Sequence, residues 1–160
     1  MRSSSLLTLA VSTLAMAACN PFHRDPVTQV SRDANLNARW NATLATPAAL
    51  AGAVQMNGTA SMQPASNDGK TDFRVQVANA TPGGLHPWQA HRGQCGMDDG
   101  TFGPASAYGS LKIGDDGRGE TGATIEERTP TTGDYFVVVY ASAANPRTVV
   151  ACGNRAAPSR

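Results

Sequence analysis

Three short stretches of the sequence carry side chains that can bind a metal ion or form a crosslink. They are residues 86–91 (HPWQAH), residues 95–96 (CG) and residues 151–153 (ACG). Imidazole nitrogens such as those of His86 and His91 are strong ligands for copper and zinc. Paired cysteines can form a disulfide bond in an oxidising compartment. The stretches therefore offer two kinds of chemistry, metal binding by imidazole and a covalent bond between distant parts of the chain.

Alternating apolar and polar residues predict that β-strands position these stretches. Phe73, Val75 and Val77 have polar neighbours on either side, and the same period of two recurs from about residue 38 onward. This period is typical of a strand with one face on a core and one face in water. Residues 135–140 are continuously apolar, which predicts a central strand covered on both faces. The expected strands are residues 40–44, 54–62, 72–77, 135–140 and 148–152.

Turn signals separate several of these runs. Residues 66–69 and 114–117 contain Asn, Asp and Gly, which tolerate positive φ and favour hairpin turns. Only residues 47–54 have a weak helical pattern. Met56 and Met62 are expected to fill the core rather than to bind copper, because they share one strand face. Short strands spaced by turns predict an all-β sandwich or barrel.

The first 18 residues are a predicted secretory signal. Arg2 supplies the positive end, residues 6–17 supply an apolar run, and small residues lead into Cys19. The run is shorter than the roughly 20 residues that a membrane span requires. Residues 14–19 resemble the lipobox of bacterial lipoproteins, in which the cysteine becomes the acylated N-terminus. Since Asn20 is not the Asp associated with inner-membrane retention, we expect Cys19 to anchor the chain in the outer membrane, facing the periplasm. An ordinary cleaved signal is the alternative.

The remaining chain divides into three parts. Residues 19–37 are polar and predict a tether, residues 38–153 a single β domain, and residues 154–160 a C-terminal tail. Loss of Arg2 with the signal reduces the 13 basic residues to 12, which balance the 12 acidic residues. A neutral chain without a basic cluster predicts no nucleic-acid partner. The lipid anchor supplies the expected membrane contact, and no exposed motif identifies a protein or small-molecule partner.

The cysteine count agrees with an oxidising location. Once Cys19 is assigned to the lipid, Cys95 and Cys152 are the one remaining pair. Their disulfide would close a loop of about 57 residues and, in the chain-entropy model, stabilise the fold by roughly 4 kcal/mol. Two buried free thiols are the competing interpretation.

Together the three stretches resemble the metal-site and disulfide framework of the Cu,Zn superoxide dismutase family. The family's copper strand has the pattern His-Gly-Phe-His-x-His, which this chain matches at His86 and His91. The resemblance covers about residues 38–153 and implies a Greek-key β-sandwich or flattened barrel of about eight antiparallel strands. It also implies the Cys95–Cys152 pairing, and it implies that His86 ties its strand to neighbouring backbone rather than binding metal.

The same resemblance implies that ligands are missing. Gln89 stands where copper needs an imidazole, and Tyr140 stands where the family has its last copper-binding histidine. Residues 96–107 correspond to the zinc loop but contain no histidine, and the whole chain has three histidines. The family's anion-attracting arginine corresponds to Val149, with Arg147 two residues too early. Both the metal and the guidance of the substrate are therefore expected to be lost.

The chemistry of dismutation makes these substitutions decisive. Copper must be held in both its +1 and +2 states by imidazole nitrogens. A carboxamide is a poor copper ligand. A phenol binds copper well only when it is deprotonated, near its ordinary pKa of about 10. The degenerate site of His86, Gln89, His91 and Tyr140 thus predicts no cofactor and no dismutase activity. We expect the last three to converge on one face of the fold, with Tyr140 filling the space of the copper.

Three functions are compatible with these residues. We interpret the chain as a lipid-anchored periplasmic domain, similar to superoxide dismutase, that is not an enzyme and has a binding or structural role. The alternative is a metal-handling lipoprotein that carries copper on His86, His91 and Met97. A third possibility is an active superoxide dismutase with an unusual site, which the histidine count disfavours.

Overall fold

The structure, a computed structural model, describes residues 39–66 and 69–156, and the strands in these ranges all pair antiparallel. The expected signal peptide, Cys19 and the tether lie outside the described residues. Two single-turn 3-10 helices, η1 (Ala48–Leu50) and η2 (Ala105–Ala107), are the helical elements of this part of the chain, and neither is long enough to span a membrane. The strands are β1 (Trp40–Ala45), β2 (Asn57–Pro64), β3 (Thr71–Ala78), β4 (Leu85–Gln94), β5 (Met97–Thr101), β6 (Ser110–Lys112), β7 (Gly119–Ile125), β8 (Tyr135–Ser142) and β9 (Asn145–Ala156).

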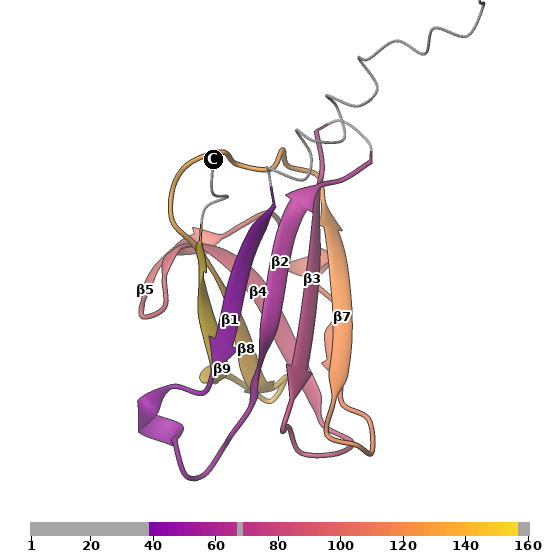
Figure 1. Ribbon diagram of the computed structural model, residues 1–160, viewed down its shortest axis with the longest axis vertical. Coiled ribbons are helices and arrows are strands. Elements are labelled where there is room, and N and C mark those ends of the chain that lie inside the picture. The colour runs from indigo at the N-terminus through magenta and orange to yellow at the C-terminus, as the bar shows by residue number, and fades with distance from the viewer. Residues whose placement is uncertain (1–38, 67–68, 157–160) are drawn as a thin grey trace, which may run out of the picture.

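The strands form one strongly curled sheet. Its order is β5-β4-β8-β9-β1-β2-β3-β7, and β6 pairs with β4. A bridge between Ile113 and Gly119 connects the end of β6 to the start of β7, so the two sides of the sheet approach each other at one end. The β2–β3–β7 side lies in front of β4 and β8 in Figure 1. Consecutive strands β3 and β4 are not neighbours in the sheet, as in a Greek key. The expected all-β antiparallel fold is confirmed.

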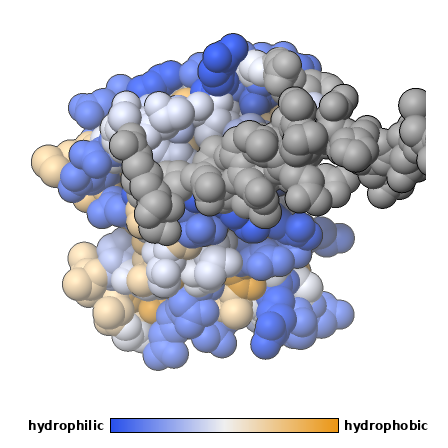
Figure 2. Space-filling model, turned by 45° about the horizontal axis from the view of Figure 1, so that its top comes forward, coloured by the Kyte–Doolittle hydropathy of each residue, from blue (hydrophilic) through white to orange (hydrophobic). Residues whose placement is uncertain are grey.

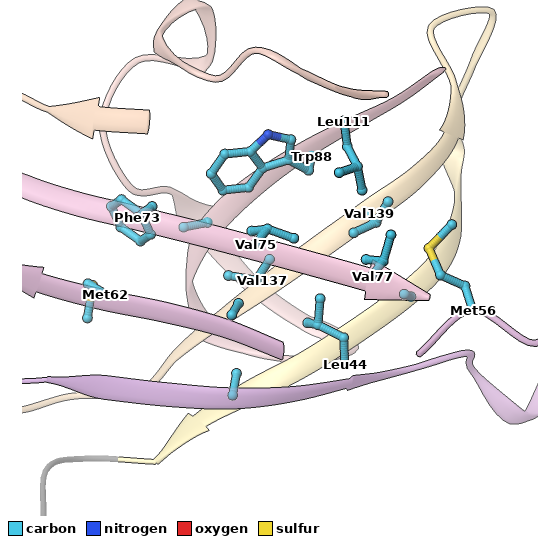
Figure 3. Close-up of a cluster of buried hydrophobic side chains, with 14 of the residues drawn as sticks. Leu44, Met56, Met62, Phe73, Val75, Val77, Trp88, Leu111, Val137 and Val139 are labelled. Atoms are coloured by element: carbon cyan, nitrogen blue, oxygen red, sulfur yellow. The ribbon is translucent and has the colours of Figure 1, made fainter. Parts of the chain in front are cut away.

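Alternating side chains build the core. In β1 the buried residues are Trp40, Ala42 and Leu44, while the residues between them are exposed. In β3 the same alternation places Val75 and Val77 inside, as the period of two predicts. Figure 3 shows these side chains meeting others from β2, β4, β8 and the segment before β2. The core residues labelled in Figure 3 are Leu44, Met56, Met62, Phe73, Val75, Val77, Trp88, Leu111, Val137 and Val139.

Several expectations for individual segments are confirmed. Met56 and Met62 are fully buried, as core filler should be. The turn over residues 114–117 is present, with Gly114 N donating to Arg118 O at 2.8 Å. Either side of the turn at residues 66–69, Ala65 N donates to Lys70 O at 3.1 Å and joins β2 to β3.

Other segments differ from the sequence expectation. The strand expected at residues 54–62 begins at Asn57, and the weak helical pattern before it yields only the single turn η1. The last strand is longer than residues 148–152, because Asn145 pairs with Ser142 at one end and Ala156 pairs with Asn41 at the other. Strand β7 was not predicted, since its glycines and threonines give little contrast between its two faces.

Strand β8 is covered on both faces, as its apolar run predicts. Val137 and Val139 belong to the main core. Phe136 and Val138 are also buried but point to the opposite face, because side chains alternate along a strand. That second face carries the candidate site. The coloured part of the face in Figure 2 is mostly polar, and Leu85 and Met97 are the large apolar side chains of the described region that stay exposed.

Candidate functional site

A disulfide bond between Cys95 and Cys152 is present and confirms the expected pairing. The two Cα atoms lie 6.1 Å apart, and the bond ties the turn after β4 to β9. The side chain of Asn154 reinforces this tie, because its Oδ1 accepts a hydrogen bond from Cys95 N at 2.7 Å. Gly153 fits where it stands because a Cβ there would collide with the backbone carbonyl of Thr43 on β1. The Ala-Cys-Gly stretch thus serves the close packing of β9 as well as the crosslink.

A polar cluster lies on the face of the sheet opposite the main core. Gln89 and His91 alternate with the buried Trp88 and Ala90 along β4, so they project to the other face. Their cross-strand partners on β8 are Val138 and Phe136, and Tyr140 follows on the same face. The structure therefore brings Gln89, His91 and Tyr140 together.

The imidazole of His91 is the centre of this cluster. Its Nε2 lies 3.2 Å from Gln89 Oε1 and 3.3 Å from the Tyr140 hydroxyl oxygen. Its Nδ1 lies 2.8 Å from Asp98 Oδ1. The ring is 5% exposed and stacks on Phe136, with 5.2 Å between the ring centroids. Both ring nitrogens are thus engaged by side chains of β4, β5 and β8.

The carboxyl of Asp98 sets the direction of the hydrogen bonds. Its partial burial raises the pKa, but the backbone N–H of Gly100, the hydrogen bond from His91 and the charge of His91 together lower the pKa below 3.8. An ionised Asp98 accepts the Nδ1–H of His91. A neutral imidazole then accepts the Tyr140 hydroxyl proton at Nε2, whereas an imidazolium donates from Nε2 to Gln89 Oε1.

The Tyr140 phenol is held in its protonated form. Burial raises its pKa, and the negative charge of Asp98 raises it further. A phenolate at this position would therefore be less available to a metal ion than the phenolate of a free tyrosine. The side chain acts as a hydrogen-bonding group.

His86 does not join the cluster. It lies on the same face of β4 as Trp88, away from His91. Its Nδ1 donates to the backbone carbonyl of Tyr140 at 2.9 Å, which ties β4 to β8. Its Nε2 is buried and has no hydrogen-bond partner among the described residues. Of the four residues of the expected degenerate site, His86 therefore ties two strands together, and the other three form the cluster.

Asp98 is the member that sequence reasoning missed. It belongs to β5, which occupies the segment expected to be a long loop. Gly96, with a φ of 89°, allows the chain to turn back so that β5 pairs with the end of β4. A register shift in this pair between His91 and Gly93 places Asp98 opposite Gly93. The Asn- and Asp-rich turn signals used elsewhere are absent here, so only the glycine could have indicated the hairpin.

The donor set does not fit the copper or zinc of a superoxide dismutase. The cluster has one imidazole, and that imidazole already has partners at both nitrogens. Gln89 offers an amide, and Tyr140 offers a phenol whose pKa is raised. Within residues 39–66 and 69–156, no group of three or more His, Cys, Asp or Glu side chains could hold a metal ion. Met97, the third residue of the copper-carrying alternative, is exposed on β5.

An apolar cavity of about 510 Å³ lies against the cluster. Phe136, Val138 and Val149 supply hydrophobic walls from β8 and β9. Asp98 and Tyr140 supply its polar groups. The remaining lining comes from Pro47, Gly96, Cys95 and Cys152. The cavity was not expected from the sequence, because its walls come from four separate segments.

No protein-family model matches this chain, and no curated protein matches it significantly. The chemistry of the cluster, the cavity beside it and the motif resemblance are therefore the grounds for a functional proposal.

Proposed function

We propose that this chain is a lipid-anchored domain of the outer membrane, similar to superoxide dismutase, that performs no metal redox chemistry and acts by binding. The arrangement around His91 is the main support. In a working copper site an imidazole must present a free lone pair to the metal. Here the Nδ1–H is donated to Asp98, and the lone pair of Nε2 accepts the hydroxyl proton of Tyr140 instead.

Copper binding would require the cluster to break its own hydrogen bonds. The ion would displace the Tyr140 hydroxyl from Nε2 and would gain one nitrogen ligand in return. The lost hydrogen bond opposes this exchange, because a buried polar group without its partner costs about 1–3 kcal/mol and the Tyr140 hydroxyl is partly buried. The ion-pair partner of the ring, Asp98, stays on the other nitrogen and does not add a second imidazole.

The surroundings also support a role other than superoxide turnover. An anionic substrate needs a positive guide, and Val149 stands where the family has its arginine. No lysine or arginine lines the adjacent cavity. A binding role requires only the apolar walls of the cavity and the carboxylate of Asp98 that lines it.

Metal content and superoxide decay test the proposal. We expect the purified wild-type domain, after incubation with copper and zinc and removal of free metal, to retain far less than one equivalent of either. Superoxide decay should match that of a protein control. One bound equivalent of copper with decay to match would overturn the proposal and favour the dismutase interpretation. Bound copper without accelerated decay would favour the metal-handling alternative.

A further inference from the structure

We propose that the cavity beside Asp98 binds a small organic cation with an apolar body, such as an aromatic or alkyl ammonium compound. This inference deepens the proposed binding role and depends on it. The cavity is a separate feature from the main core, because Phe136 and Val138 are buried but belong to the opposite face of β8. They form the floor on which a ligand's apolar body can pack.

The size and walls of the cavity suit a small molecule. Its volume of about 510 Å³ lies within the range of roughly 300–1,000 Å³ that ligand pockets occupy. Val138, Val149 and the Cys95–Cys152 bridge offer apolar contact. The disulfide holds the turn after β4 against β9, so this side of the cavity is formed before any ligand binds.

The polar side of the cavity selects a positive charge. Asp98 Oδ1 accepts hydrogen bonds from His91 and from Gly100 N, at 2.8 Å in both cases. No hydrogen bond within the described residues uses Oδ2, and the side chain is 53% exposed. One carboxylate oxygen therefore remains available to a donor that enters the cavity. An ammonium group supplies both the donor and the opposite charge.

Other lining residues favour a cation over an anion or a neutral ligand. Phe136 and Tyr140 are aromatic, and aromatic faces attract ammonium groups. Lysine and arginine are absent from the lining, so nothing there would offset the charge of an anionic ligand. His91, the hydrogen-bond partner of Asp98, is buried and does not line the cavity.

Titration with three matched compounds tests the inference. The secreted chain with Cys19→Ser, purified without detergent, is titrated with phenethylammonium, 2-phenylethanol and 3-phenylpropanoate, which share an aromatic body. NMR shifts of the Val138 and Val149 methyl groups report occupancy of the cavity. We expect the ammonium compound to bind more tightly than the alcohol, and the carboxylate to bind most weakly.

Two variants isolate the charge of Asp98. Asp98→Asn retains the acceptor for His91 and should weaken the ammonium compound by about three- to tenfold, while binding of 2-phenylethanol stays unchanged. Asp99→Asn removes the same charge from the next residue of β5, which does not line the cavity, and should change neither affinity. Thermal melting of both variants shows that each is folded.

Three outcomes would overturn the inference. The first is that 2-phenylethanol binds as tightly as the ammonium compound. The second is that Asp98→Asn and Asp99→Asn lose equal affinity for the ammonium compound. The third is that the methyl signals of Val138 and Val149 do not shift at millimolar ligand. Copper content and superoxide decay are measured without any amine present. A failure of the proposed function is therefore read in those assays and is distinguishable from a failure of the cation site.

Discussion

The Nδ1 atom of His91 donates a hydrogen bond to Oδ1 of Asp98 across 2.8 Å, and this bond joins the fourth strand to the fifth. His91 is nearly fully buried, whereas about half of the Asp98 side chain is exposed. The bond therefore connects the buried polar cluster to the surface of the cavity. A substitution that removes the oxygen acceptor of Asp98 would disturb the imidazole, whereas Asp98→Asn keeps the acceptor and removes the charge that a ligand meets.

Asp98 should make the stability of the fold depend on acid pH. Its pKa in the folded state is below the ordinary 3.8, so its contribution is complete above that pH and is lost as the pH falls through the folded value. Asp98→Asn should lower the melting temperature at pH 7 by about 1–4 °C, since the pair is partly exposed. Melting curves at pH 7 and pH 2.5 check this. A difference between wild type and variant that persists undiminished at the lower pH would count against it.

Loss of the disulfide should destabilise the domain strongly. Cys152→Ser removes the bond that closes a separation of 57 residues. Removal of a native disulfide typically costs about 2–5 kcal/mol. Urea denaturation of the variant and of wild type, with and without reductant, measures the loss. Reductant should leave the variant unchanged, and wild type that is equally stable when reduced would contradict the prediction.

Arg155 should be a site where an apolar residue improves stability. Its side chain is buried, its guanidinium lies 5.0 Å from the Phe73 ring centroid, and its three nitrogens have no hydrogen-bond partner among the described residues. Burial lowers its pKa to about 9, with the charge of Tyr108 opposing that shift. Arg155→Met should raise the free energy of unfolding by about 1–3 kcal/mol, because an uncompensated buried charge is removed.

The exposed Arg147 provides the matched control for that substitution. Arg147→Met makes the same chemical change on the surface and should alter stability by less than about 0.5 kcal/mol. Urea denaturation of both variants at pH 7 gives the comparison. A destabilised Arg155→Met would contradict the prediction and would show that the contact of the guanidinium with the Phe73 ring outweighs the cost of burying the charge.

Restoring imidazoles should create a copper site at the cluster of Gln89, His91 and Tyr140. In the double variant Gln89→His and Tyr140→His, two new imidazoles join His91, which together could supply three nitrogen ligands. We expect about one copper per chain after incubation and gel filtration, with each single variant well below that level. Copper retention by the single variant Gln89→His equal to that of the double variant would show that Tyr140 does not occupy the ligand position.

The lipid anchor is tested by fractionation. The lipobox resemblance implies that Cys19 is acylated, so Cys19→Ser should move the protein from the membrane fraction to the periplasmic fraction. Wild-type protein released without detergent would exclude the anchor. Asn20→Ser is a suitable control, because it changes the neighbouring residue, keeps the cysteine and still lacks the Asp of inner-membrane retention.

Local patterns in the sequence were enough to predict much of the fold. Trp40, Ala42 and Leu44 predicted their strand because a period of two must place alternate side chains on one face. The run at residues 135–140 predicted a strand buried on both faces for the same reason. The pairing of Cys95 with Cys152 followed once Cys19 was assigned elsewhere, since two cysteines allow one bond. These inferences need only neighbouring residues or a count.

The tertiary structure alone decided which side chains meet. Asp98 reaches His91 because the fifth strand folds back with a register shift, and hydrogen bonding between strands, rather than the composition of residues 97–101, sets that register. The burial of Arg155 depends on Ala42 and Phe73 from other strands. The cavity exists because the fold brings Pro47 and the Cys95–Cys152 disulfide together with Phe136 and Val138 of the eighth strand. Contacts of this kind join residues far apart in the chain, so no local pattern of hydrophobicity contains them.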